Sequence, residues 1–321
     1  MRNIHIDVAK GISIFFVVLG HVLMKRGDTD VFPLQFIYSF HMPLFFIISG
    51  MFLNIHRNLK EVVINKGVAL LYPYCIFSVI AILFITSKYM VGIVDKDDVI
   101  DIILISVSLQ GYGVLWFLPT LYLGIIFFHL LYKCQYNKLF LIGLILVNLF
   151  LNSFPDHISS NIIFIFLYRV MMTTLFLSVG HFIVEKSILK LNGRIVTFVS
   201  CLLILLNSFL CRLNGLVDYH LTIFNNMLLF IYFAITTSIS ILILCNRCNN
   251  RLLSYWGENS LTIMLTHYVF PVLSFGLWIG NNVTSPYISI VIIIFIIMII
   301  ETILCRFVNQ RCLWLVKYKV K

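Results

Sequence analysis

The segment Ile290–Ile300 reads IVIIIFIIMII and contains no polar side chain. Strands of a membrane barrel alternate apolar and polar residues, so an unbroken apolar run indicates a helix, which satisfies its own backbone hydrogen bonds in lipid. The whole chain shares this character: of its 321 residues, 61% are hydrophobic and 11% are charged, and the mean hydropathy is +1.02. Soluble domains carry about 25% charged residues. The composition therefore excludes a soluble enzyme, a disordered protein and a secreted disulfide scaffold.

Apolar runs long enough to cross a bilayer recur along the chain. A spanning helix needs roughly 20 apolar residues, and a window of about 19 residues selects these segments: 8–24, 32–54, 67–87, 114–132, 138–154, 162–184, 195–210, 221–245, 259–280 and 286–305. We therefore predict an all-α polytopic membrane bundle of about ten transmembrane helices. Residues 1–321 are expected to form one integral membrane domain.

Lysine and arginine are distributed unevenly between the two faces that this alternation defines. Of the 23, 17 fall on the face that holds the N-terminus, and Arg169 lies within a span. The opposite face holds only Lys25, Arg26, Lys88, Lys96 and Arg212. Because cytoplasmic loops are enriched in Lys and Arg, we predict that both termini are cytoplasmic. The net charge of +10 is explained by this orientation and does not indicate nucleic-acid binding.

Ionisable side chains inside the predicted spans need a partner or a function, since each costs roughly 2.5–3.5 kcal/mol on insertion scales. These residues are Asp7, Lys10, His21, His41, Arg169, His181, His267 and Glu301. The step from Lys10 to His21 leaves a rotation of only about 20°, and Asp7 lies one turn before Lys10, so these three share one helical stripe. The same step covers about 16 Å along the axis. Lys10 is thus expected near the cytoplasmic face and His21 in the outer half.

His41 is expected at the depth of His21. The second helix returns antiparallel, and positions 21 and 41 are symmetric about residue 31, so the two imidazoles should approach one layer. Pro43 cannot donate to the Ser39 carbonyl, which leaves a free acceptor beside His41. We predict functional roles for His21 and His41, and a substrate-orienting role for Arg169, which enters its span near the same layer.

The other histidines and the cysteines are given structural interpretations. His129, His181 and His267 are expected to be packed helix contacts, whereas His5, His56, His157 and His220 are expected to be solvated. Pro271 frees the carbonyl of His267 in the same way as Pro43 frees that of Ser39. The eight cysteines are scattered, and the pair Cys245 and Cys248 has no second pair near it in sequence, so no metal site is predicted.

Several motifs occur in order along the chain. They are Asp7-Val8-Ala9-Lys10 with Gly20-His21, Phe40-His41-Met42-Pro43-Leu44-Phe45-Phe46 with Ser49-Gly50, Lys66 with Leu70-Leu71-Tyr72-Pro73-Tyr74, Trp116-Phe117-Leu118-Pro119, and Asn259-Ser260-Leu261 with His267. Together they resemble the acyltransferase 3 family of integral membrane O-acyltransferases, in its fucose-4-O-acetylase-like branch. In one respect the chain departs from the family. An Arg-x-x-Arg pair often opens the third helix, whereas this chain has Lys66-Gly67-Val68-Ala69.

The resemblance implies transfer of an acyl group, with acetyl expected, from acetyl-CoA as donor substrate to a glycan hydroxyl. It implies that His21 is the catalytic base and that Lys10 is its paired cation, with Asp7 beside it. Imidazole suits this task because its unperturbed pKa of about 6.5 lies close to the operating pH.

The developing oxyanion needs hydrogen-bond donors, for which His41, Arg169 and Trp116 are candidates. Lys10 and Lys66, with Tyr72 nearby, are the expected acyl-donor site, because lysines are charge partners for phosphates. Coenzyme A would then lie in the cytoplasmic mouth with its thioester arm reaching the histidine layer.

A secondary transporter or glycan flippase with an intramembrane His, Lys and Arg relay is the alternative. Transporters built from inverted repeats tend to show interrupted helices in corresponding halves, and no such pair is evident in the sequence. The expected partners are acyl-CoA, a cell-surface glycan or its precursor, and the lipid bilayer. We expect a multi-pass protein of a bacterial cell membrane. The acceptor, its membrane face and the oligomeric state stay open.

Overall fold

The computed structural model describes residues 3–27, 32–132, 137–153, 162–191, 193–280, 283 and 285–318. Regular structure within these ranges is helical, apart from one isolated bridge between Asp218 and Ile223. The helices are α1 (Ile4–Lys25), α2 (Phe32–Met51), α3 (Leu59–Met90), α4 (Lys96–Val107), α5 (Phe117–Tyr132), α6 (Asn137–Asn152), α8 (Ile162–Glu185), α9 (Arg194–Leu210), α10 (Met227–Cys245), α11 (Arg251–Glu258), α12 (Ser260–Val269), α13 (Val272–Gly280) and α14 (Pro286–Arg311). Short 3-10 turns are η1 (Gly113–Trp116), η2 (Ile188–Lys190), η3 (Cys211–Leu213) and η4 (Leu313–Leu315). Parts of the predicted loops, including residues 28–31 and 154–161, lie outside the described ranges.

The predicted all-α polytopic bundle is confirmed. Within the described ranges, eight helical segments are long and apolar enough to cross a membrane, and the bent pair α12 and α13 brings the number to nine if it forms one span. The predicted run 138–154 corresponds to α6, whose 16 residues extend about 24 Å, less than the roughly 30 Å of a hydrocarbon core. The predicted run 221–245 also differs, because α10 begins only at Met227.

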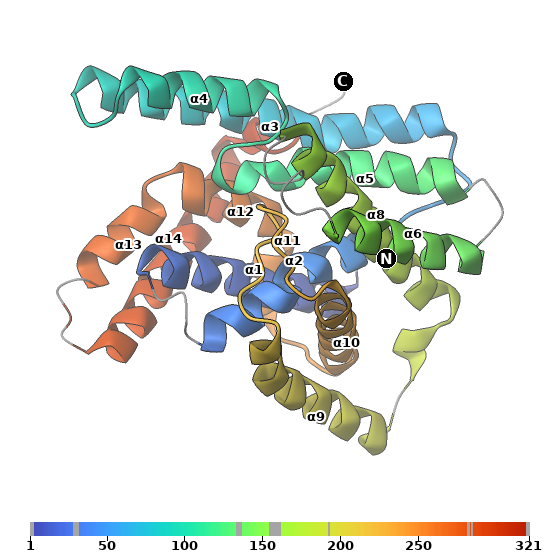
Figure 1. Cartoon of the computed structure of the whole chain (residues 1–321). Coiled ribbons are helices and arrows are strands. Elements are labelled where there is room, and N and C mark those ends of the chain that lie inside the picture. The colour runs from blue at the N-terminus through green and yellow to red at the C-terminus, as the bar shows by residue number, and fades with distance from the viewer. Residues whose placement is uncertain are drawn as a thin grey trace.

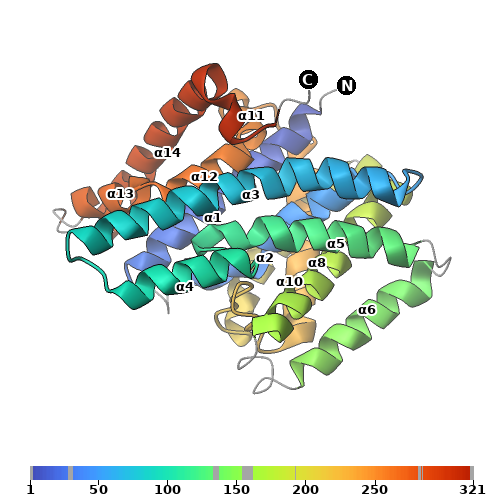
Figure 2. The same cartoon turned by 90° about the horizontal axis from the view of Figure 1, so that it is seen from above.

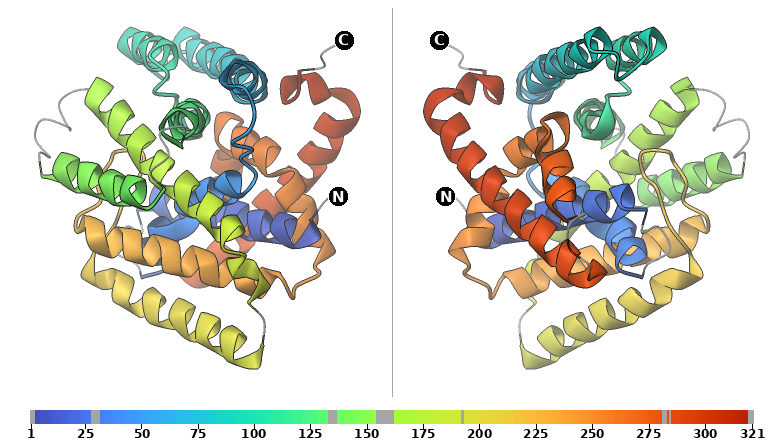
Figure 3. Two further views of the ribbon diagram at one scale, coloured as in Figure 1. Left: turned by 90° about the vertical axis from the view of Figure 1, so that its right-hand side faces the viewer. Right: turned by 90° about the vertical axis from the view of Figure 1, so that its left-hand side faces the viewer.

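Helices α1 and α2 form the centre of the bundle (Figure 1). Of the most apolar window of α2, 78% is buried, against 17% for α9, which lies along the outer edge beneath α10 (Figure 3). On the opposite side, α3, α4 and α5 run side by side (Figure 2). Sequence motifs with polar residues therefore occupy the enclosed helices, whereas α9 presents apolar side chains outward, as a lipid-facing helix requires.

Two close helix crossings hold α1 and α2 in place. At the crossing of α1 with α11, a Cβ atom added to Gly257 would lie 1.7 Å from the Asp7 carbonyl oxygen. At the crossing of α2 with α8, a Cβ atom added to Gly180 would lie 1.9 Å from the Ile47 carbonyl oxygen. Small residues allow membrane helices to approach this closely. The positions of the histidines on α1 and α2 thus depend on glycines elsewhere.

The break between α12 and α13 lies at Pro271. The two helices are bent by 65° relative to each other. Because proline has no N–H group, it cannot bond to the carbonyl four residues earlier, that of His267, and its ring disfavours continuation of the helix. Helix α12 therefore ends at Val269, two residues after His267.

Candidate active site

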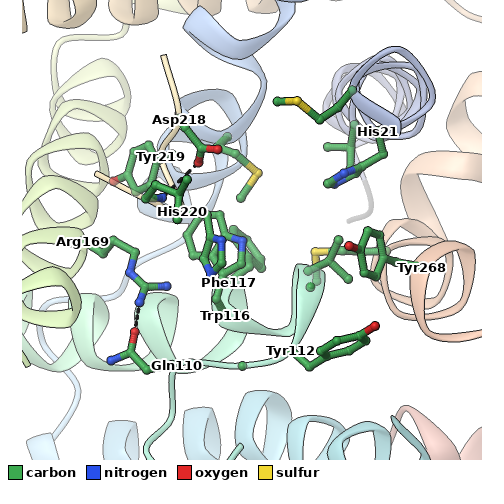
Figure 4. A pocket seen from close by; sticks show the side chains of 18 of the residues that line it. His21, Gln110, Tyr112, Trp116, Phe117, Arg169, Asp218, Tyr219, His220 and Tyr268 are labelled. Atoms are coloured by element: carbon green, nitrogen blue, oxygen red, sulfur yellow. Dashed lines mark hydrogen bonds between the residues drawn. The ribbon is translucent and has the colours of Figure 1, made fainter. Parts of the chain in front are cut away.

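A cavity of about 670 Å³ lies among α1, α2, α8, α12, the segment before α5 and the loop before α10. His21, His41, Trp116 and Arg169 all line it, and Figure 4 shows three of them, His21, Trp116 and Arg169. The structure thus brings together four of the predicted site residues, which come from four different parts of the chain. The volume of the cavity is within the usual range for ligand pockets, about 300–1,000 Å³.

His21 is located one turn before the end of α1, and its ring points into the cavity (Figure 4). Within the described part of the chain, its ring nitrogens form no hydrogen bond. The ring centroid lies 5.4 Å from that of His267 and 5.4 Å from that of Tyr268. His21 is therefore free to bond to a ligand.

His267 and His41 share one tautomer. The Nδ1 atom of His267 lies 2.8 Å from the Ile263 carbonyl oxygen, and that of His41 lies 2.7 Å from the Ile37 carbonyl oxygen. A carbonyl oxygen can only accept, so each Nδ1 carries the proton, and in the neutral ring each Nε2 has a lone pair. The Nε2 atom of His267 is buried without a hydrogen-bond partner.

The histidine neighbouring His21 was not the one expected from the sequence. His41 lines the same cavity, as its predicted depth requires, but its ring packs 5.0 Å from Tyr38. His267, expected to be a packed helix contact, lies beside His21 instead. Helix α12 is far from α1 in sequence, so no local spacing could reveal this proximity. The available signal was Pro271, which ends α12 just after His267.

Arg169 lies on α8 and is 1% exposed. Its Nη2 donates to the Gln110 side-chain oxygen, and its guanidinium carbon lies 5.5 Å from the centre of the Trp116 ring. The Gln110 amide nitrogen donates in turn to the Ile162 carbonyl, at 3.0 Å. Because the amide nitrogen of Gln110 is used in that bond, its side-chain oxygen is the atom that faces Arg169.

The irregular segment before α10 contributes a further wall. Backbone hydrogen bonds in both directions between Asp218 and Ile223 fold it over the cavity, where His220 stacks on Trp116 at 5.6 Å. Partial burial and the nearby Arg169 lower the pKa of His220 to about 4, and burial raises the pKa of Asp218. His220 was expected to be a solvated loop residue. That prediction was wrong. The predicted span began at residue 221, whereas α10 begins at Met227, and the residues just before α10 form a loop that packs over the cavity.

The remaining predicted site residues lie elsewhere. Lys10 Nζ is 3.6 Å from Asp7 Oδ1 and 5.5 Å from the centre of the Phe52 ring. Phe52 also lines a cavity of about 90 Å³ together with Arg57 and Lys66. Lys10 and Lys66 are therefore linked through one aromatic ring at the N-terminal end of α1.

Tyr72 does not join this group. Six residues along a helix correspond to about 240° of rotation, so Tyr72 and Lys66 project from different faces of α3. The Tyr72 ring instead contacts Tyr318, with centroids 5.2 Å apart.

Fold and cavity together define a multi-pass membrane protein whose helical bundle encloses a chamber with histidine and arginine side chains in its wall. Residues 3–306 match the acyltransferase 3 family, whose model is described as an acyltransferase domain. The chain belongs to this family.

Two curated relatives are nodulation proteins NolL. The protein from Mesorhizobium japonicum is 29% identical over 147 residues, which cover 43% of this chain and 38% of that protein. The protein from Sinorhizobium fredii is 41% identical over 81 residues, covering 22% of each. The chain thus aligns with less than half the length of these relatives. No solved structure matches it.

Proposed function

We propose that this acyltransferase moves an acyl group, with acetyl as the first candidate, from acyl-CoA to a hydroxyl of a cell-surface glycan or its precursor. One observation carries the proposal: His21 points into a cavity of about 670 Å³ with free ring nitrogens, next to a second histidine whose Nε2 has no partner. Such an arrangement suits proton transfer to and from a bound hydroxyl.

In the proposed reaction, His21 accepts the proton of the acceptor hydroxyl as its oxygen attacks the thioester carbonyl. The new C–O bond gives a tetrahedral oxyanion, and its collapse breaks the C–S bond. The departing thiolate takes the proton from the His21 imidazolium, which restores the neutral ring. With its lone pair on Nε2, His267 stabilises the protonated His21 ring through a hydrogen bond that forms after a small rotation of the two side chains.

The tautomer of His41 bears on the oxyanion site. Its only N–H group in the neutral ring is bonded to the Ile37 carbonyl, so neutral His41 has no donor left for an oxyanion. The Trp116 indole N–H and the Tyr268 hydroxyl line the same cavity and can donate. Of the predicted candidates, we favour Trp116 over His41 for this role.

We place the phosphates of the acyl donor against the cations around Phe52. Lys10, Arg57 and Lys66 gather there, and Asp7 lies beside Lys10. Lysine binds phosphate as a point charge. Since Lys10 lies about 16 Å from His21 along α1, the flexible arm of the donor would extend between the two sites.

The test uses purified protein in proteoliposomes, with labelled acetyl-CoA and a panel of glycan acceptors. Replacing His21→Ala should lower transfer by about 10²–10⁴-fold, the usual contribution of a general base, while the thermal unfolding midpoint stays close to that of the wild type. Full activity of that variant would remove His21 as the base. Solute accumulation without acylated product would favour the transporter alternative, although α12 and α13 form only one interrupted pair within the described residues.

A further inference from the structure

Arg169 has hydrogen-bonding capacity that the protein does not use. The side chain is 1% exposed, and only its Nη2 is bonded, to the Gln110 side-chain oxygen. Its Nε and Nη1 atoms are buried without any partner. A guanidinium group stays protonated in proteins, so these donors belong to a full positive charge.

That charge is not neutralised by a contacting group. No carboxylate among the described residues lies within ion-pair distance of Arg169. Asp218 acts on Arg169 only electrostatically, and its carboxylate accepts from the Leu221 backbone N–H at 3.0 Å. Gln110 is neutral. A buried charge without a partner is strongly unfavourable, so such residues mark places where a ligand completes the pairing.

Contacts within the protein hold both Gln110 and the Arg169 guanidinium in fixed positions. Gln110 is anchored by its own bond to the Ile162 carbonyl, and the guanidinium carbon lies 5.5 Å from the Trp116 ring and 5.9 Å from the Phe166 ring. These contacts fix the plane of the guanidinium. In Figure 4 the group faces the cavity with its unbonded side.

Charge on the cavity wall selects the ligand. Among its charged side chains, Lys25 and Arg169 are cationic and Asp218 is acidic, so the lining carries a positive excess. A guanidinium fork matches the two oxygens of a carboxylate or phosphate. The donor phosphates already have a proposed site near Phe52, at the other end of α1.

We propose that Arg169 and Gln110 form a subsite for an anionic substituent, a carboxylate or a phosphate, on the acceptor glycan. This inference rests on the proposed function. It makes Arg169 a specificity-determining residue for the acceptor, positioned across the cavity from His21 (Figure 4).

The test measures binding as well as turnover, with the full chain in nanodiscs. Three matched oligosaccharides serve as probes: one bearing a uronate, its carboxyl-reduced neutral form, and one bearing a sugar phosphate. We expect the wild type to bind at least one anionic probe about tenfold or more tightly than the neutral probe, without any acyl donor present. The stronger of the two anionic probes identifies the source of the charge.

Two variants remove the unpaired charge of the subsite by different means. Arg169→Gln removes the charge and should reduce the preference for the anionic probe to about one. Gln110→Glu supplies a carboxylate to Arg169 and should abolish the preference too, at the cost of the bond to the Ile162 carbonyl. The second variant therefore keeps the test valid if the first does not fold.

Equal binding of charged and neutral probes by the wild type would overturn the inference, as would an unchanged preference in Gln110→Glu. A matching loss of acetyl-CoA binding in Arg169→Gln would show that the donor supplies the anion, which also overturns it. Because binding is measured without turnover, failure of the acyl-transfer proposal would be seen separately.

Discussion

A methyl group at the crossing of α1 and α11 should impair both stability and catalysis. In Gly257→Ala the new Cβ would lie 1.7 Å from the Asp7 carbonyl oxygen and 2.9 Å from the Gly11 backbone nitrogen. Ordinary contact begins at 3.4 Å, so the first distance is 1.7 Å too short. Both obstacles are backbone atoms, so the helices themselves must separate.

The magnitude follows from this displacement. Overpacking of a filled interior costs about 1–3 kcal/mol of unfolding free energy. Helix α1 also carries His21, and a misplacement of about 1 Å at a reacting group can lower the rate by about 10²-fold. We therefore expect kcat for acyl transfer to fall by about that factor, with a smaller change in KM for acyl-CoA.

The assay combines transfer kinetics in proteoliposomes with thermal unfolding in detergent. Gly143→Ala on α6 is the matched control, because a Cβ atom there meets nothing within 4 Å. It should keep wild-type activity and gain up to about 1 kcal/mol from helix propensity. The reasoning is refuted if Gly257→Ala matches the wild type in both measurements, or if the control loses as much activity.

Three further outcomes are expected. His267→Ala should lower kcat about 10²-fold with little change in KM, because it removes the partner of the protonated base. Steady-state kinetics measure both constants, and an unaltered kcat would leave His267 with a packing role alone. Lys66→Ala should raise KM for acyl-CoA several-fold with kcat largely retained, whereas Tyr72→Phe should change neither; a KM that responds only to Tyr72→Phe would move the donor site. His220 has a folded-state pKa of about 4, below the unfolded value of about 6.5. The unfolded chain therefore binds a proton first as pH falls from 6.5 to 4, and stability should drop over that window by up to about 3 kcal/mol. Unfolding midpoints of His220→Asn should depend less steeply on pH there, and parallel curves for variant and wild type would contradict this.

Local periodicity was sufficient to predict the helical class and much of the cavity. His21 and His41 lie on consecutive helices, so counting residues about their turn placed both in one layer. Arg169 could be recognised because a charge within an apolar run is rare. These predictions depend only on helix geometry and on the cost of burying polar groups.

The missed residues depend on contacts between distant parts of the chain. His267 contacts His21 because α12 packs on α1. Gln110 contacts Arg169 from an irregular segment, where no helical periodicity is available to predict the direction of a side chain. His220 was missed because the apolar residues after it extended the predicted span too far. Tyr72 was assigned by its proximity to Lys66 in sequence, where helical rotation separates their side chains.

Lys10 and His21 lie on the same rigid rod, which therefore acts as a ruler. On the proposed placement of the donor, the helix fixes the distance between the site of the phosphates and the site of the thioester carbonyl. It does not restrict the acyl chain that extends beyond that carbonyl. The enzyme should accordingly be strict about the carrier and more tolerant of the length of the transferred chain. A single residue inserted between the two positions would turn the histidine by about 100°, away from the chamber, without shortening the rod.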